Sequence, residues 1–394
     1  MTDAVIVGAC RTAIGNLGGA LSALRAPALG AAALAEAIRR AGVKPDQVQE
    51  VVMGQVLQAG IGQHPARQAA LAAGLPVSVS ACSVNKMCGS GLLAVGLAAR
   101  AVQTGEVEVA AAGGMESMSQ APFLLDQART GYRLGHGTLR DSLIHDGLWD
   151  AAGDCHMGRT AEHLAQTYGI SRADQDAYAV QSQARCAAAL AKGLFAEEIT
   201  PVSVPQRRGE PVLVREDEFP RPDTTLDKLA KLKPAFQKDG TVTAGNASGI
   251  NDGAAALVLA SAAAARRFGL APLARVRAWA TAGLEAANMG LGPVPAARLA
   301  LSRAGLTLAD MDLIEINEAF AAQILAVKKE LAWDDARVNV NGGALALGHP
   351  IGASGARILV TLLYEMKRRQ ARLGLAALCI GGGEGIAMVV ERTA

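Results

Sequence analysis

Short continuous apolar runs alternate along the chain with longer stretches in which apolar residues recur at helical spacing. Residues 4–7 form a run that predicts a buried strand, and residues 51–56 predict a second one. Small residues from about 27 to 40 follow a helical pattern between them. Apolar, mostly small residues repeat again at 92–102, so we predict a helix that packs closely on its neighbours and carries Cys88 in its first turn.

Parts of this pattern occur twice. Chance similarity between Ala- and Gly-rich segments would explain any one match, but three matches in the same order and at nearly constant spacing favour a duplicated αβ unit. We therefore predict two αβ halves packed against each other, with ligands near strand ends and helix starts at their junction. The matching pairs are 40–52 with 303–315, Cys-Gly-Ser-Gly at 88–91 with Gly-Ala-Ser-Gly at 352–355, and, more loosely, 110–114 with 379–383.

The two copies are separated by a more charged, Pro-containing region, which we interpret as an inserted domain. Within it, Ser171 and Asp174 predict the capped start of a helix whose polar face carries Asp176 and Gln183. The predicted divisions are 1–120 plus 249–272 for the N-terminal half, 121–248 for the insertion and 273–394 for the C-terminal half.

Composition and charge narrow the classes of partner. The 394 residues are 51% hydrophobic but only 3% aromatic, so small side chains must provide much of the packing. The formal net charge is +2 with acids and bases interspersed, which argues against a nucleic-acid surface or a basic membrane patch. No stretch reaches the ~20 continuous apolar residues of a membrane span. Strand-like residues begin at Ala4, so we expect no signal peptide and a soluble, cytoplasmic protein, with a processed organellar protein as the alternative.

The 6 cysteines lack the paired spacing of a zinc site and the density of a disulfide scaffold, so we expect reduced thiols and no metal. One of them, Cys88, lies between Lys86 and a Gly-rich helix start. Unpaired N–H groups at a helix start favour an anion and lower the pKa of a thiol. Cys88 is therefore a candidate nucleophile, with a buried cysteine that acts as a small hydrophobe as the alternative.

A second candidate is His349, which lies in a segment too rich in glycine for an ordinary core strand. A structural histidine is the alternative, but this one occupies the duplicated position that corresponds to the Cys88 loop. A Cys–His pair provides acyl-transfer chemistry, because the imidazole takes the thiol proton and the thiolate attacks a carbonyl.

Two more motifs follow predicted strands of the second copy. Cys379 precedes three consecutive glycines, whose N–H groups are suited to an oxyanion hole, although a structural turn beside a buried cysteine is the alternative. Asn317 follows the strand at 313–316 and is suited to hold a water or an oxyanion, with Glu318 orienting it. A helix N-cap explains Asn317 equally well.

Together the motifs around Cys88, Asn317, His349 and Cys379 resemble those of the thiolase family in order and spacing, over essentially the whole chain. Residues 240–255 are also thiolase-like. The resemblance implies an α/β fold of duplicated αβαβα halves, packed in five layers, with an inserted loop domain.

The segment from His156 to Gly158 and the short approach through Leu148 resemble the biosynthetic members of the family. Those enzymes condense two acetyl-CoA molecules to acetoacetyl-CoA and CoA, and also catalyse the reverse thiolysis. The resemblance implies ping-pong chemistry in which Cys88 becomes acetylated.

The family resemblance also implies a role for each candidate. His349 activates Cys88, and Cys379 removes a proton from the methyl group of the second acetyl-CoA. One oxyanion hole combines His349 with a water held by Asn317, and the other uses the N–H groups of Cys88 and Gly381.

Coenzyme A is then part of the substrate and product, and no permanently bound cofactor is expected. The resemblance places Arg221 near its adenine and phosphate end and Ser248 and His156 along its pantetheine arm. Lys228 lies where relatives carry either a small polar residue or a base, so its contact with a phosphate stays open. The remaining contacts implied are Leu148, Met157, Phe236, Ala244 and Phe320.

Glu384 departs from the Met or Gln expected after the glycines, so its carboxylate either faces solvent or raises the pKa of Cys379. The resemblance further implies a homotetramer, as a dimer of dimers, with contacts made by residues 121–137.

Three alternatives stay open. A degradative 3-ketoacyl-CoA thiolase shares every catalytic residue and differs in the pocket wall near Met157. A carrier-protein-dependent ketoacyl synthase has the same fold, but Cys379 argues against it. A non-catalytic acyl-CoA- or lipid-binding relative would lack the nucleophile chemistry. A nucleotide-dependent dehydrogenase is disfavoured, because no G-x-G-x-x-G follows a strand with an acid about 20 residues on.

Overall fold

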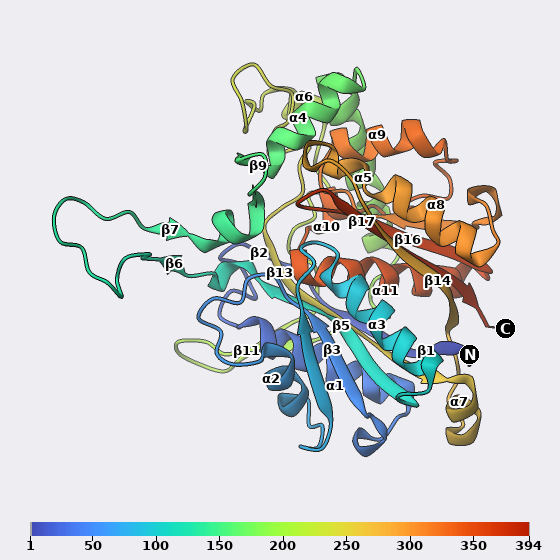
Figure 1. Cartoon of the computed structure of the whole chain (residues 1–394). Coiled ribbons are helices and arrows are strands. Elements are labelled where there is room, and N and C mark those ends of the chain that lie inside the picture. Colours follow the sequence, from blue (N-terminus) through green and yellow to red (C-terminus); the bar gives the residue numbers. More distant parts are fainter. Residues whose placement is uncertain (1, 394) are drawn as a thin grey trace.

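A computed structural model describes residues 2–393 and arranges them in layers of helices, sheet, helices, sheet and helices (Figure 1). The N-terminal half, in blue and cyan, forms the lower part of the view, and the C-terminal half, in orange and red, forms the upper right. Much of the insertion, in green, lies above them. The predicted class, an α/β fold with duplicated halves, is confirmed.

Four strands of each half share the same order and the same pairing directions, and the N-terminal half has β4 as an additional edge strand. In the N-terminal half the order is β4-β3-β5-β13-β1, and in the C-terminal half it is β15-β16-β17-β14. β3 is parallel to β5 as β15 is parallel to β16, and the following pairs are antiparallel in both halves. The strands are β1 (Ala4–Thr12), β3 (Glu50–Gly54), β4 (Ser80–Val84), β5 (Val109–Ser117), β13 (Asn251–Ser261), β14 (Ala274–Gly283), β15 (Leu313–Ile316), β16 (Leu373–Ile380) and β17 (Glu384–Arg392).

β1 and β14 also pair with each other, so the two sheet layers are joined at this edge into one continuous sheet, with the central helices packed between its two halves. The outer face of the N-terminal half is covered by α1 (Ala26–Ala41), α2 (Pro65–Ala72) and α7 (Ala262–Phe268). The outer face of the C-terminal half is covered by α8 (Pro293–Ala304) and α9 (Ala321–Leu331). Small side chains dominate these contacts, as the composition requires.

The central layer consists of two helices, α3 (Ser90–Thr104) and α11 (Ile351–Arg369), which occupy equivalent positions in the two copies. They cross where both carry glycine. A Cβ on Gly91 would lie 2.8 Å from the backbone nitrogen of Ala356, and a Cβ on Gly355 would lie 2.5 Å from that of Leu92. The duplicated Ser-Gly motif is therefore where the two central helices pack in direct contact.

The insertion contains α4 (Met157–Thr167), α5 (Arg172–Ala191) and α6 (Leu226–Ala230). It also contains a hairpin that projects away from the body, formed by β6 (Phe123–Leu124) and β7 (Arg140–Asp141) (Figure 1). The smaller elements of the chain are β2 (Gly15–Asn16), β8 (Trp149–Asp150), β9 (Cys155–His156), β10 (Ile199–Thr200), β11 (Val202–Val204), β12 (Val212–Val214), α10 (Ala344–Leu347), a π-helix at Leu143–Leu148 and 3-10 helices at Pro45–Gln47, Met118–Gln120, Ala286–Leu291 and Leu308–Asp310.

Two local predictions differ from the structure. Helix α3 begins at Ser90, so Cys88 precedes the helix instead of lying in its first turn. The capping box of Ser171 and Asp174 is confirmed, but the predicted polar face of α5 is wrong, since Asp176 and Gln183 are both buried. These two side chains bind segments that are remote in the chain: Asp176 accepts from the Asn246 amide, and Gln183 donates to the backbone carbonyl of Leu345 in α10.

Candidate active site

The candidate residues surround a cavity of about 360 Å³ where both halves and the insertion meet. Both Cys88 and Cys379 open onto it, together with His349. Its wall is largely apolar with a few polar groups, as is usual for a small-molecule site. The remaining lining residues are Met118, Gly147, Leu148, His156, Met157, Phe219, Arg221, Ala235, Phe236, Ala244, Ala247, Ser248, Gly249, Ile250, Met289, Ala319, Phe320, Ile351 and Gly381.

Cys88 lies in a tight loop between β4 and α3. Met87 adopts a left-handed conformation with φ +45°, which turns the chain into the helix. Ser90 fixes this turn, because its hydroxyl accepts from the N–H of Lys86 at 2.8 Å and donates to the carbonyl of Met87 at 2.6 Å. The loop therefore holds the half-buried Cys88 side chain at the cavity.

Burial raises the pKa of the Cys88 thiol to about 11, although the backbone N–H groups of Gly381 and of Cys88 itself oppose this shift. The expected lowering of the thiol pKa by the helix start is therefore wrong, because desolvation outweighs the favourable N–H groups. A thiol in this state is protonated at neutral pH, so acyl transfer requires a base that removes its proton as the bond forms.

His349 follows α10 and lies against the start of α11. Its Nδ1 lies 2.5 Å from Ser354 Oγ, and that hydroxyl donates to the carbonyl of Pro350 at 2.9 Å. Since the Ser354 proton is engaged with Pro350, Nδ1 must donate, and Nε2 is left as a proton acceptor. Burial and the charge of Arg357 lower the pKa of the imidazole to about 3, so His349 is neutral.

Asn317 lies behind His349, at the end of β15. Its Nδ2 is 3.4 Å from His349 Nε2, and its buried Oδ1 has no hydrogen-bond partner. Helix α9 begins at Ala321 with Phe320 as its N-cap, so the capping alternative for Asn317 is wrong. Asn317 does not itself line the cavity, so its side chain can reach the reacting groups only through His349 or a bound water.

Glu318 was expected to orient Asn317, and this expectation is wrong. Its carboxylate instead accepts hydrogen bonds that tie α5 and two loops of the C-terminal half together. The donors are the hydroxyls of Tyr178 and Ser182, the amide of Asn339 and the backbone N–H of Leu345.

Cys379 lies at the end of β16 and is almost fully buried. Burial, with the nearby Cys88 as a smaller cause, raises the pKa of its thiol far above the ordinary value. The turn that follows contains Gly382 and Gly383 with φ near +90°, a conformation that favours glycine. Glu384 turns toward Lys86, whose Nζ lies 2.5 Å from Glu384 Oε1, and the carboxylate is partly exposed.

The residues expected along coenzyme A line the same cavity, with one exception. His156 stacks on Phe236 with ring centres 4.7 Å apart, and Phe236 meets Phe320 edge to face. Arg221 lies at the junction of this cavity with a neighbouring hollow. Lys228 lines only that second hollow and pairs with Asp223.

Several polar residues of the site were not singled out from the sequence. Glu116, at the end of β5, accepts hydrogen bonds from the N–H groups of Val56, Leu57 and Gly352, and so fixes the start of α11 beside His349. Burial raises the pKa of its carboxyl to about 7. Asn251 accepts from the backbone N–H of His349 at 2.9 Å.

No sequence signal identifies Glu116 or Asn251, because their partners are distant in the chain. Ser354 is different. It corresponds to Ser90 in the duplicated motif, and each serine fixes the catalytic loop that precedes its helix. The duplication therefore contained the signal for both serines.

The chain belongs to the thiolase family. Residues 4–263 match the thiolase N-terminal domain and residues 270–392 match the thiolase C-terminal domain. Proteins named acetyl-CoA acetyltransferase are similar over the full length of both chains: the one from Cupriavidus necator is 59% identical over 392 residues, and the one from Escherichia coli 57% over 393. The crystal structure of the Bacillus anthracis acetyl-CoA acetyltransferase superposes with a TM-score of 0.98 at 47% identity, covering 100% of this chain and 99% of that one.

Within 2–393, no helix has the length and apolar character needed to cross a bilayer. The same residues contain no group of three or more His, Cys, Asp or Glu side chains arranged to hold a metal ion.

Proposed function

We propose that this thiolase is an acetyl-CoA C-acetyltransferase, which condenses two acetyl-CoA molecules to acetoacetyl-CoA and CoA and catalyses the reverse thiolysis. The observation that carries the proposal is the meeting of two thiols and a neutral imidazole in one apolar cavity. Full-length relatives with 55–59% identity that are named acetyl-CoA acetyltransferase support the same activity.

In the proposed first step, the Cys88 sulfur attacks the thioester carbon of acetyl-CoA while His349 Nε2 takes the thiol proton. The tetrahedral intermediate then collapses, and the proton passes to the departing CoA sulfur. The N–H groups of Cys88 and Gly381 are suited to stabilise the oxyanion, since both act on the Cys88 sulfur. The products are acetyl-Cys88 and free CoA.

In the proposed second step, His349 Nε2 takes the proton of the Cys379 thiol, and the resulting thiolate removes a proton from the methyl group of a second acetyl-CoA. The enolate oxygen accepts from the now protonated Nε2 of His349 and from a water held by Asn317, whose Oδ1 has no protein partner. The methyl carbon attacks the carbonyl carbon of acetyl-Cys88, and the bond to the Cys88 sulfur breaks. The proton on His349 Nε2 passes to the Cys88 sulfur, while Cys379 keeps the methyl proton, so both thiols and the neutral imidazole are restored.

We propose that the pantetheine arm passes the aromatic stack of His156 and Phe236 and the side chain of Ser248, with the apolar groups of Leu148, Met157, Ala244 and Phe320 around it. Arg221, at the outer end of the cavity, is the proposed contact for the adenine and phosphate end. Lys228 is paired with Asp223, which makes it a weaker candidate for a phosphate.

The competing enzyme is a degradative 3-ketoacyl-CoA thiolase. The sulfur of Met157 lies close to the backbone of Gly381, since a Cβ built on that glycine would be 3.3 Å from the sulfur. Met157 therefore narrows the cavity beside the reacting groups. A short acyl chain suits this wall better than a long one. The test compares the rates of thiolysis of acetoacetyl-CoA, 3-ketohexanoyl-CoA and 3-ketodecanoyl-CoA. The C4 substrate should have the highest kcat/KM. A higher kcat/KM for the longer chains would contradict the proposal.

The alternative from another class is a non-catalytic acyl-CoA-binding protein. Incubation with acetyl-CoA followed by mass spectrometry of the protein distinguishes an enzyme from a binding protein. An enzyme gains one acetyl group on Cys88 and releases CoA, whereas a binding protein takes up acetyl-CoA without any change of mass.

We further propose a cytoplasmic homotetramer. The β6–β7 hairpin projects from the body (Figure 1) and carries exposed apolar side chains, including Phe123, Leu134 and Leu139. Burial against other subunits would remove this apolar surface from water. Light scattering should give four times the chain mass of 40.3 kDa, and Leu134→Asp should shift the assembly to a smaller species.

A further inference from the structure

Two loops from different halves of the duplicated fold meet beneath the reacting thiols. The loop before α3 carries Cys88, and the turn between β16 and β17 follows Cys379. Gly89 packs directly against Ile380, since a Cβ on the glycine would lie 2.4 Å from the isoleucine side chain. The N–H of Gly381 reaches the Cys88 thiol at the same place.

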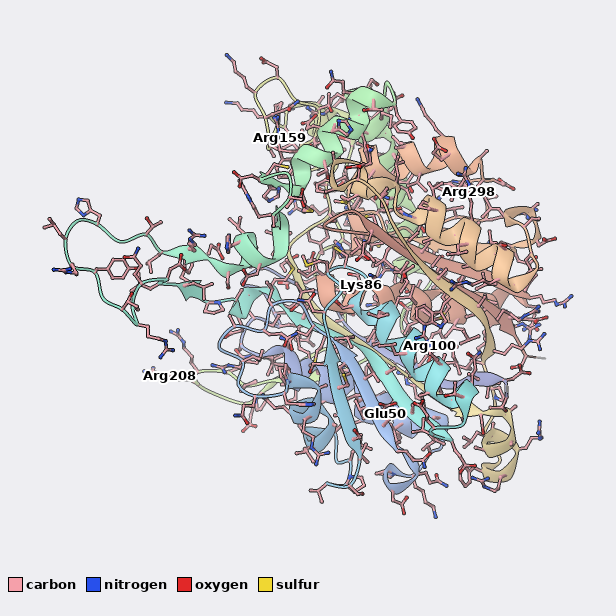
Figure 2. All side chains as sticks on the ribbon, in the orientation of Figure 1. Glu50, Lys86, Arg100, Arg159, Arg208 and Arg298 are labelled. Carbon is pink, nitrogen blue, oxygen red and sulfur yellow. The ribbon has the colours of Figure 1, made fainter. Side chains whose placement is uncertain are left out.

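An ion pair between Lys86 and Glu384 links the same two segments. Lys86 Nζ lies 2.5 Å from Glu384 Oε1, and the two side chains are 17% and 41% exposed. In Figure 2 Lys86 lies near the middle of the view, whereas Arg159, Arg208 and Arg298 lie toward its edge. The pair thus joins the N-terminal half to the C-terminal half near both thiols.

Each partner belongs to a backbone segment that is itself fixed. The N–H of Lys86 donates to Ser90, and its carbonyl accepts from Gly89 at 2.9 Å. Glu384 begins β17 and pairs in the sheet with Ile380 on one side and Gly283 on the other. A link between these two side chains therefore restrains the Cys88 loop relative to the Cys379 turn.

A partly exposed ion pair contributes little to the free energy of unfolding. Its effect on the site is different, because displacement of a reacting group by about 1 Å costs on the order of 100-fold in rate. Cys88, Cys379 and the Gly381 N–H must be correctly spaced when the carbon–carbon bond forms.

We propose that Lys86 and Glu384 act together as positioning residues, which set the spacing of Cys88 relative to Cys379 and the Gly381 N–H. The inference rests on the proposed function, since it concerns the step that joins the two acetyl groups. Neither residue touches the reacting atoms in this role.

A double-mutant cycle tests the proposal. Lys86→Met, Glu384→Gln and the double variant are compared with the native enzyme by kcat and KM for the condensation. Each single variant should lower kcat by about 10-fold with KM changed less than about 2-fold, because alignment and not substrate binding is lost. The double variant should lose no more than either single one, since both remove the same link.

Lys86→Arg retains the charge and should keep most of the native kcat. The matched control is Glu108→Gln, which breaks a surface ion pair with Arg267. Glu108 immediately precedes β5, at the opposite end of that strand from Glu116. Unchanged kcat in either single variant, or losses that multiply to about 100-fold in the double variant, would overturn the proposal. If the native enzyme formed no acetyl-Cys88, the proposed function itself would fail, which is a different result from native activity with unaffected variants.

Discussion

The imidazole of His349 and the hydroxyl of Ser354 lie 2.5 Å apart, and the serine is in turn held by the carbonyl of Pro350. This arrangement fixes Nδ1 as the donor and Nε2 as the acceptor. A base oriented by a third group is a recurring arrangement for activating a nucleophile. Here the third group is a neutral hydroxyl, which orients the imidazole without adding charge.

Ser354→Ala should therefore lower the rate of Cys88 acetylation by roughly 10- to 100-fold, because the imidazole loses its orientation and its preferred tautomer. KM for acetyl-CoA should change little. Stopped-flow measurement of CoA release in a single turnover, at several acetyl-CoA concentrations, checks the acetylation rate and its dependence on acetyl-CoA. Ser354→Thr retains the hydroxyl and serves as the control, and an unaffected Ser354→Ala rate would contradict the assigned tautomer.

The two thiols should be separable by substitution. Cys88→Ser should form no acetyl-enzyme, because a serine hydroxyl is a far weaker nucleophile than a thiol. Cys379→Ser should still acetylate Cys88 but fail to condense, since a serine cannot take the methyl proton. Mass spectrometry after mixing with acetyl-CoA measures the first step, and acetoacetyl-CoA formation measures the whole reaction. A folded Cys379→Ser protein without acetylation would mean that the roles are assigned wrongly.

The helix crossing should be sensitive to a single methyl group. Gly91→Ala and Gly355→Ala each place a Cβ within 2.8 Å of backbone, so each should lower the free energy of unfolding by about 1–3 kcal/mol or more. Gly283→Ala is the matched control, because a Cβ there meets nothing within 4 Å and its φ is not positive. Urea denaturation compares the three, and equal midpoints would contradict the tight crossing.

The neutral state of His349 has opposite consequences for activity and stability in acid. Because the folded pKa is about 3, the imidazole remains a base at pH 5.5, and the rate of Cys88 acetylation should show no loss centred near pH 6.5. The unfolded chain binds a proton near pH 6.5 that the folded chain does not. This contribution to stability is present above pH 6.5 and is lost as the pH falls toward 3.

The stability prediction is checked by the urea denaturation midpoints of the native protein and of His349→Asn at pH 7 and pH 5. The native midpoint should fall more than that of the variant, which lacks the titrating group. A rate that instead halves near pH 6.5 would show that His349 titrates normally.

The sequence predicted the fold and the principal candidates because a duplicated αβ unit leaves a visible repeat. That repeat placed the Cys88 loop opposite the His349 loop, and the structure brings both to one cavity. Burial could not be predicted in the same way. The thiol of Cys88 is next to a helix start in the sequence, yet the packing around it raises its pKa, and only the assembled cavity determines the balance.

Polar contacts between distant segments were missed for the same reason. Asp176 and Gln183 fit the polar face of a surface helix, but loops that are remote in the chain cover them. In the sequence, Glu116 resembles any acidic residue near the end of a strand. Only the folded structure shows that the N–H groups of three other residues donate to its carboxylate. Such sites depend on tertiary structure that no local pattern describes.

The crossing of α3 and α11 near their first turns has an electrostatic consequence. Both helices start at the cavity, and each N-terminus carries roughly half a positive charge from its aligned peptide dipoles. The field that favours a thiolate or an enolate therefore comes from backbone that the duplication supplies twice. Substitutions in the cavity wall leave this field in place, so the fold can change its acyl preference and keep the means to stabilise an anion.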